Sequence, residues 1–208
     1  AIVSGGGARA TRAQLEAVLP RFIGDIAQIP PMYSALKRDG QKLCDLARQG
    51  IDVKVEPRPT QVYAIDVLHE NEDGSFILQI RCGRGTYIRT LCNDIGEALG
   101  TKAHMGVLLR TQTGMFTLDE AHTIEEIDAA EDLTPLLVAM DKPLGHLPRL
   151  DVQPKAERFV RNGNKLTQRE LIGDIQPGKP TRLYLNGQFC GIGRFEGENL
   201  KFDAMLLE

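Results

Sequence analysis

Two side chains that can do chemistry, Tyr87 and Arg89, follow a short turn of sequence Gly83-Arg84-Gly85. A guanidinium beside a phenol can hold a carboxylate or a phosphate through paired hydrogen bonds. If a helix begins here, its free N–H groups and the positive end of its dipole also favour an anion. The plainer alternative is an ordinary strand–turn–helix connection with a solvated Arg89, and a short Gly-rich turn alone does not distinguish the two.

The elements that would position these side chains can be predicted from the periodicity around them. From Phe76 to Cys82, apolar residues alternate with other residues, which predicts a strand with a buried face. From Thr86 the period becomes helical, with Ile88, Leu91, Ile95 and Leu99 at helical spacing and Gly100 where a helix end favours positive φ. A strand therefore leads through the glycine turn into a helix.

Three separate blocks of sequence, in order along the chain, resemble the TruB family of tRNA pseudouridine synthases. The resemblance extends from about Gln14 to Met140. The blocks are Ile29–Lys37 with Gly40–Leu43 and Ala47–Ile51, then Gly85–Thr90 with Asn93–Gly96 and Leu99–Gly100, and finally Ala103–Met105 with Leu108 and Arg110–Thr111.

The resemblance implies a reaction and roles for three residues. The family isomerises uridine 55 in the T-arm of tRNA after the base has left the RNA stack, using an aspartate in a Gly-His-…-Leu-Asp-Pro loop. Arg89 matches the arginine that keeps this carboxylate ionised, and Tyr87 matches a tyrosine suited to proton handling at C5. Leu108 matches a leucine that packs near the target base, although Leu109 departs from the arginine common there. No metal, nucleotide or redox cofactor is implied.

The same resemblance implies tRNA as the partner. In the family, the region matching residues 28–56 is a mobile thumb that closes on the T-arm. Candidate RNA contacts are Tyr33, Ser34, Lys37, Lys42, Arg48 and, in the glycine turn, Arg84. The alternative for each is a surface loop or short amphipathic helix with solvated charges.

The catalytic aspartate of the family has no match in this chain. Asp94 belongs to the predicted helix, and Asp25, Asp39 and Asp141 do not lie in a Leu-Asp-Pro loop. We expect the chain, which starts at Ala1 with a glycine-rich stretch, to be part of a longer protein and to be inactive alone. One alternative is an RNA-binding protein that has lost catalysis. A nucleotide-phosphate binder is disfavoured because the turn lacks the Gly-Lys-Ser/Thr ending of a phosphate loop.

Composition sets limits on these functions. The 208 residues carry a net charge of −3, so RNA must be bound by local basic patches, while acidic residues gather from Asp119 to Asp132. Four separated cysteines suggest neither a zinc site nor a disulfide framework. Apolar runs are too short to cross a bilayer and no signal-peptide pattern is present, so we expect a cytoplasmic protein without a membrane partner. We also expect a monomer.

The expected fold class is α+β, a mixed and largely antiparallel sheet with flanking helices. We predict a partial catalytic domain over residues 1–147 and a small β-barrel-like domain over 148–208. The latter resembles the PUA-type domain that helps hold the tRNA acceptor arm. The breakers between Asp141 and Pro148 mark the predicted boundary. An RNA cleft is expected where the hairpin of residues 58–82 meets the motif helix, and missing strands would leave sheet edges unpaired.

Local signals predict the remaining elements. Capping boxes open helices at Thr11 and Thr123, and Pro20 should end the first of these. His104, which has no metal or nucleophile partner, is expected to be a hydrogen-bonded structural residue. The other predicted elements are a short helix within Gly40–Gly50, a hairpin of Arg58–Glu70 with Ser75–Cys82, one or two strands within Ala103–Phe116, a helix over Pro154–Asn162, and a hairpin around Asn186-Gly187 that continues into Leu200–Leu207.

Overall fold

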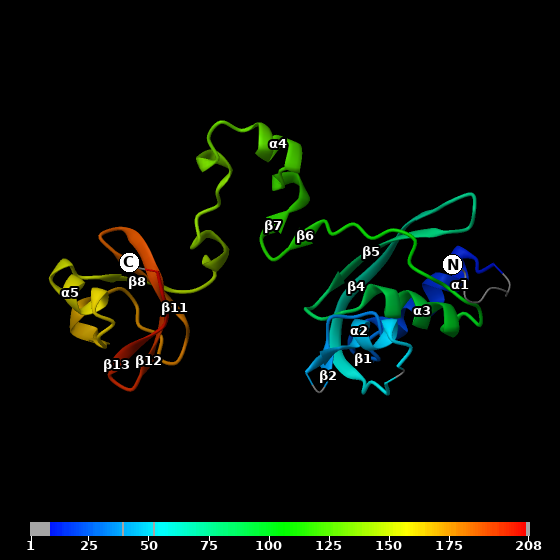
Figure 1. Cartoon of the computed structure of the whole chain (residues 1–208), viewed down its shortest axis with the longest axis horizontal. Helices are drawn as coiled ribbons and strands as arrows, with labels where there is room; N and C mark the ends of the chain where they lie inside the picture. The colour runs from blue at the N-terminus through cyan, green and yellow to red at the C-terminus, as the bar shows by residue number, and fades with distance from the viewer. Residues whose placement is uncertain (1–8, 39, 52, 207–208) are drawn as a thin grey trace. The chain divides into compact units, whose positions relative to one another are not determined.

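The computed structural model describes residues 9–38, 40–51 and 53–206. The expectation about the glycine-rich start falls mainly on residues 1–8, and this stretch and Asp39 lie outside the described residues. The chain divides into two compact units, a first unit of Ala1–Leu108 and a second unit of Leu109–Glu208 (Figure 1). Helices and mainly antiparallel sheets make up these units, which confirms the α+β class. The predicted boundary between residues 147 and 148 stays a prediction.

The first unit is built on a three-stranded antiparallel sheet. Its strands are β1 (Gly24–Gln28), β4 (Arg58–Glu70) and β5 (Phe76–Cys82), in the order β1-β4-β5. The predicted hairpin is therefore confirmed, and its turn closes through the hydrogen bond from Asn71 N–H to the Ser75 carbonyl, 2.8 Å. Within the described residues, β1 and β5 each pair only with β4, which confirms the unpaired sheet edges.

Helices cover one face of this sheet and form the core with it. These are α1 (Arg12–Val18), a 3-10 helix (Leu19–Phe22) and α3 (Ile88–Ala98), which lie beside the β4–β5 hairpin in Figure 1. The Thr11 capping box is present, and α1 gives way to the 3-10 helix just before Pro20, as predicted. The buried core residues are Leu15, Val18, Leu19, Val62, Ile65, Leu91 and Ile95, with Phe76, Leu78, Ile80 and Cys82 of β5 packed against them.

A small hairpin and helix lie between β1 and β4. Strands β2 (Lys37–Arg38) and β3 (Gln41–Lys42) pair antiparallel and lead into α2 (Leu43–Arg48), which confirms the predicted short helix. Its apolar face is buried through Leu43 and Leu46, because both point inward at helical spacing. Lys42 and Arg48 are exposed, as expected.

The segment after α3 departs from the prediction. Residues 103–111 are in neither helix nor strand, so the strand predicted within Ala103–Phe116 is wrong over most of its length. Only β6 (Gln112–Thr113) and β7 (Phe116–Thr117) pair, as a minimal hairpin. Val107 is 90% exposed. The predicted strand does not form here because this apolar side chain has no sheet to pack against. His104 is also exposed and makes no hydrogen bond within the described residues, so the expected structural histidine is wrong.

The second unit contains a six-stranded sheet in the order β10-β8-β11-β12-β13-β9. Only the β8–β11 pair is parallel. The hairpin predicted around Asn186-Gly187 is confirmed between β11 and β12. Asn186 (φ 51°) and Gly187 (φ 78°) both have positive φ, as a type I′ turn requires. The bounds are β8 (Arg149–Val152), β9 (Leu166–Thr167), β10 (Leu171–Ile172), β11 (Thr181–Leu185), β12 (Gln188–Glu196) and β13 (Asn199–Met205).

Short helices complete the second unit. The predicted helix over Pro154–Asn162 is present as a 3-10 turn followed by α5 (Glu157–Arg161), and α4 (Ile124–Ala129) begins at the Thr123 capping box. No helix in the described part of the chain is both long and apolar enough to cross a membrane. The 3-10 helices are Leu118–Glu120, Thr134–Leu136, Lys142–Leu144, Pro154–Ala156 and Gln168–Glu170.

A buried tyrosine attaches the chain before β8 to the sheet of the second unit. The Tyr184 hydroxyl donates to the Asp141 carboxylate at 2.5 Å and accepts from Arg182 at 3.3 Å. The guanidinium of Arg149 lies 3.8 Å from the centre of the Tyr184 ring. The hydroxyl and the two nearby arginines hold the pKa of Asp141 below its usual value, whereas burial raises the pKa of Tyr184.

We predict that Tyr184→Phe lowers the melting temperature of the second unit by an amount that depends on pH. A carboxyl whose pKa is lowered by folding stabilises the fold above its ordinary pKa, and this stabilisation is lost as the pH falls. The loss caused by Tyr184→Phe should therefore be full at pH 7 and shrink as the pH falls through about 4. Melts of the whole chain across this range provide the measurement. Tyr63→Phe is the control, since Tyr63 is exposed and has no hydrogen bond within the described residues. An effect independent of pH contradicts the role of Asp141.

Candidate RNA-modification site

The glycine turn before α3 is attached to β4 by its own polar groups. Gly83 N–H donates to the Gln61 carbonyl at 2.7 Å, and the Thr86 hydroxyl donates to the Gly83 carbonyl at 3.0 Å. The hydroxyl oxygens of Thr86 and Thr60 are 2.6 Å apart, within hydrogen-bond distance. Gly85 has a φ of +88°, a region that other residues enter only with strain. The entry to α3 is thus held in one conformation.

Tyr87 occupies the N-cap position of α3, where a short polar side chain usually accepts a hydrogen bond from the first turn. Tyrosine cannot do this, and no side chain among the described residues caps α3. The buried side chain of Gln28, 3% exposed, instead holds the Tyr87 backbone. Its Oε1 accepts from Tyr87 N–H at 2.9 Å, and its Nε2 donates to the Tyr87 carbonyl at 3.3 Å. This N–H, which an anion at the helix start could have used, is therefore occupied.

The first turn of α3 is also connected to the loop that follows Gln28. Arg89 Nη2 donates to the Tyr33 carbonyl at 2.9 Å, and the Thr90 hydroxyl donates to the Ile29 carbonyl at 3.3 Å. The structure therefore brings Arg89 to Tyr33, two residues that sequence analysis had singled out in separate blocks. Gln28 was missed, and its position at the end of a strand gave no signal that its amide pairs with the motif helix.

The electrostatics of this helix start favour an anion near Arg89. Arg89 is exposed and forms no ion pair with any of the described residues, so its remaining N–H groups face solvent. Further along α3, burial raises the pKa of the Asp94 carboxyl and of the Cys92 thiol. A thiol with a raised pKa stays protonated and is a poor nucleophile. Within the described part of the chain, no cluster of His, Cys, Asp or Glu could hold a metal ion.

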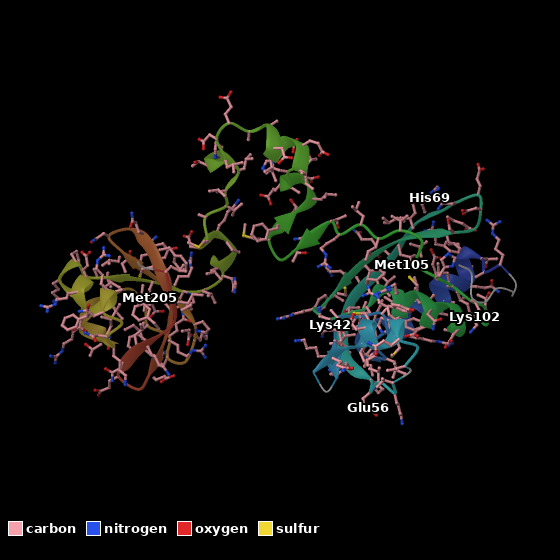
Figure 2. The ribbon with its side chains drawn as sticks, viewed as in Figure 1. Lys42, Glu56, His69, Lys102, Met105 and Met205 are labelled. Atoms are coloured by element: carbon pink, nitrogen blue, oxygen red, sulfur yellow. The ribbon has the colours of Figure 1, made fainter. Side chains whose placement is uncertain are left out.

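The predicted RNA-contact residues differ in how they are presented. Lys37 and Lys42 are exposed and lie directly opposite each other in the β2–β3 pair, and Figure 2 labels Lys42 on this hairpin. Arg48 is exposed but lies 3.4 Å from the Asp45 carboxylate. Tyr33, 60% exposed, and Arg84 also face solvent.

Two other predicted site residues, Ser34 and Leu108, do not offer an exposed polar side chain. Ser34 is only 6% exposed, and its hydroxyl has no hydrogen-bond partner within the described residues, so a contact with RNA requires this loop to open. Leu108, predicted to pack near the target base, is 55% exposed and belongs to neither buried core cluster. The roles of both residues stay predictions.

We predict that Gly85→Ala destabilises the first unit by about 1–2 kcal/mol, the cost of placing a side chain in the left-handed region. Gly106→Ala is the matched control, because Gly106 has no positive φ and a methyl group there meets open space. Chemical denaturation of both variants provides the measurement. Equal stabilities of the two variants would show that the turn is not held as described.

Comparisons with known proteins place the chain in a family. Residues 3–88 match the family described as "TruB family pseudouridylate synthase (N terminal domain)", and residues 89–144 match "tRNA pseudouridylate synthase B C-terminal domain". The tRNA pseudouridine synthase B of Alkaliphilus oremlandii is 43% identical over 195 residues, which cover 92% of this chain and 64% of the relative. The protein of the same name from Clostridium perfringens is 36% identical over 200 residues, covering 95% of this chain and 68% of the relative.

Solved structures show the same fold. A Cbf5-Nop10-Gar1 complex contains a chain with a TM-score of 0.68 and 24% identity, matched over 97% of this chain and 63% of that one. An H/ACA RNP bound to a substrate RNA containing 2′-deoxyuridine contains another, with a TM-score of 0.70, 20% identity, and coverage of 98% and 64%. This chain spans 64% and 60% of the relatives from Alkaliphilus oremlandii and Dechloromonas aromatica. Together, the matched segments and the identities show that the chain belongs to the TruB family of pseudouridine synthases.

Proposed function

We propose that the protein containing this chain is a tRNA pseudouridine synthase that isomerises uridine 55 in the T-arm of tRNA. The observation that carries the proposal is the arrangement at the start of α3. Arg89, whose guanidinium is exposed, follows Tyr87 by two residues on a helix start that hydrogen bonds attach to both β4 and the loop after β1. Relatives that are 36–43% identical and named tRNA pseudouridine synthase B support it.

The reaction needs groups that this arrangement can supply. The C1′–N1 bond of the uridine breaks, the uracil turns, a C1′–C5 bond forms, and the proton on C5 is lost while N1 gains one. A carboxylate must act at the sugar or the base, and Arg89 would keep it ionised and oriented, since a nearby opposite charge favours the charged form. Tyr87 would move the C5 proton, and Leu108 would pack near the base. We propose that the carboxylate comes from outside these 208 residues, because no aspartate here lies in a Leu-Asp-Pro loop.

The β2–β3 hairpin is suited to bind the RNA backbone. Lys37 and Lys42 lie opposite each other, and like charges in that position are destabilising in the free protein. A phosphate between them would remove this repulsion, so the arrangement favours a polyanionic partner. Tyr33, Arg48 and Arg84 would extend the contact, and Ser34 would join it if the loop opens.

The domain from residue 148 is proposed to hold the acceptor stem of the tRNA, as the small β-rich PUA-type domain does in the family. Its six-stranded sheet and buried core support an independent module. We further propose that the protein works as a monomer in the cytoplasm. The main alternative is an RNA-binding protein without catalysis, for which an arginine directed at a carboxylate has no use.

We predict that Arg89→Ala in the full-length protein lowers isomerisation on the order of 100-fold, as expected for loss of a charge that acts in the transition state. Release of tritium from tRNA carrying 5-tritiated uridine measures the rate. Arg21→Ala is the control, since Arg21 is an exposed arginine of the same unit on the 3-10 helix after α1. Unchanged turnover in Arg89→Ala contradicts the role of Arg89. Tight tRNA binding without tritium release by the wild-type protein supports the non-catalytic alternative.

The lysine pair gives a separate prediction. The double variant Lys37→Gln, Lys42→Gln should bind tRNA more weakly and reduce the slope of log K against log salt by about 1.5, as expected for two lost phosphate contacts. It should also be slightly more stable, because the repulsion between the lysines is gone. Filter binding at several salt concentrations and a thermal melt provide the measurements. Lys102→Gln is the control, because Lys102 lies 3.5 Å from Glu97. A salt slope equal to that of the control removes the lysine pair from the RNA interface.

A further inference from the structure

Gln28 connects β1 to the residue that the proposed reaction uses for proton transfer. We propose that Gln28 is a positioning residue for Tyr87: its side-chain amide fixes the Tyr87 backbone and thereby the direction of the phenol. The inference rests on the proposed function, because it assigns Gln28 a role in that reaction.

The geometry is that of one amide paired with another. Gln28 Oε1 accepts from Tyr87 N–H at 2.9 Å, and Gln28 Nε2 donates to the Tyr87 carbonyl at 3.3 Å. Glutamine offers a donor and an acceptor in one plane, which few side chains do. Gln28 is 3% exposed, and its own backbone pairs with Arg58 of β4. Both bonds are therefore partly buried, and a buried polar group left without a partner is costly.

Tyr87 needs this support because of where it lies. As the N-cap residue of α3 it has an extended backbone, φ −96° and ψ 102°, and its N–H lies outside the regular hydrogen bonds of the helix. Its carbonyl accepts from Leu91 N–H at 3.0 Å as well as from Gln28, whereas its N–H donates to Gln28. With Gln28 removed, the N–H of Tyr87 has no partner among the described residues. The direction of the phenol would then be free to vary.

Other contacts keep the helix start in place without Gln28. Arg89 still bonds the Tyr33 carbonyl, Thr90 the Ile29 carbonyl, and Thr86 the Gly83 carbonyl. Removing the Gln28 amide should therefore misplace Tyr87 more than it unfolds α3. The expected signature is a loss in kcat with little change in KM, because tRNA contacts elsewhere are intact.

The test uses the full-length protein with Gln28→Met, which has similar length but no amide. We expect kcat to fall roughly 10- to 100-fold, the range for a misplaced catalytic group. KM should stay within about threefold, since ground-state binding is retained. Hydrogen exchange of the Tyr87 amide, followed by NMR, should become faster. Leu15→Ala is the control, because Leu15 is a buried core residue of the same unit whose side chain has no polar group.

The variant Gln28→Glu gives a second measurement with a different readout. An ionised carboxylate still accepts from Tyr87 N–H but cannot donate to the Tyr87 carbonyl, whereas the protonated form can do both. The ratio of its kcat to that of the wild-type protein should therefore rise as the pH is lowered. A purely structural role would leave this ratio constant. The Gln28→Glu variant also tests the positioning role if Gln28→Met does not fold.

The outcomes separate the inference from the proposed function. A kcat of Gln28→Met no lower than that of Leu15→Ala, an unchanged Tyr87 amide exchange rate, or a Gln28→Glu ratio that does not vary with pH overturns the positioning role. In each of these cases an active wild-type protein leaves the synthase proposal standing. A wild-type protein that binds tRNA but releases no tritium overturns the proposed function and this inference with it.

Discussion

The first unit depends on how the start of α3 is held. Its N-cap position is occupied by Tyr87, a residue that cannot cap a helix, so the helix start is held by hydrogen bonds of another kind. Gln28 pairs with the Tyr87 backbone, and Thr86 holds the glycine turn against β4. Tyr87 can occupy the cap because residues distant in the sequence hold its backbone and the turn before it.

The same contacts connect the proposed chemistry to the proposed RNA contact. Arg89 donates to the carbonyl of Tyr33, and Tyr33 lies in the loop that leads to the β2–β3 hairpin and its lysine pair. A shift of this loop would therefore also move the Arg89 guanidinium that is bonded to it. Because the net charge of the chain is −3, its basic groups act by local arrangement and not by overall attraction. The lysine pair is one such arrangement, in which repulsion in the free protein favours a bound phosphate.

The second unit is organised around a polar contact of a different kind. Tyr184 is buried within the β-rich module, yet its hydroxyl reaches Asp141, in the chain before β8. Arg149 and Arg182 lie near this pair. Their positive charges balance the negative charge of the Asp141 carboxylate at the edge of the core. The residues around the predicted boundary at Asp141–Pro148 are thereby attached to the sheet, and they do not form a simple linker.

Much of the local structure could be read from the sequence, because it depends on neighbouring residues. The β4–β5 hairpin, the Thr11 cap, the Asn186-Gly187 turn and the strand leading into α3 follow from periodicity and turn chemistry. The blocks around Tyr33, Tyr87 and Arg89 also identified the family. Strands between 103 and 111 were predicted wrongly because an apolar run such as Val107–Leu109 does not reveal whether a sheet is present to receive it.

Tertiary structure alone decided which groups meet. Gln28 and Tyr87 are 59 positions apart, and Arg89 and Tyr33 are 56 apart. No local pattern encodes such pairs, because they form only when β1 has paired with β4 and α3 has packed on the sheet. The burial of Ser34 and the pairing of Lys37 with Lys42 depend in the same way on how the chain between β1 and β4 folds back on itself. The sequence therefore determined which helices and strands form and which reactive side chains are present. The packing of distant segments decided how those side chains are oriented.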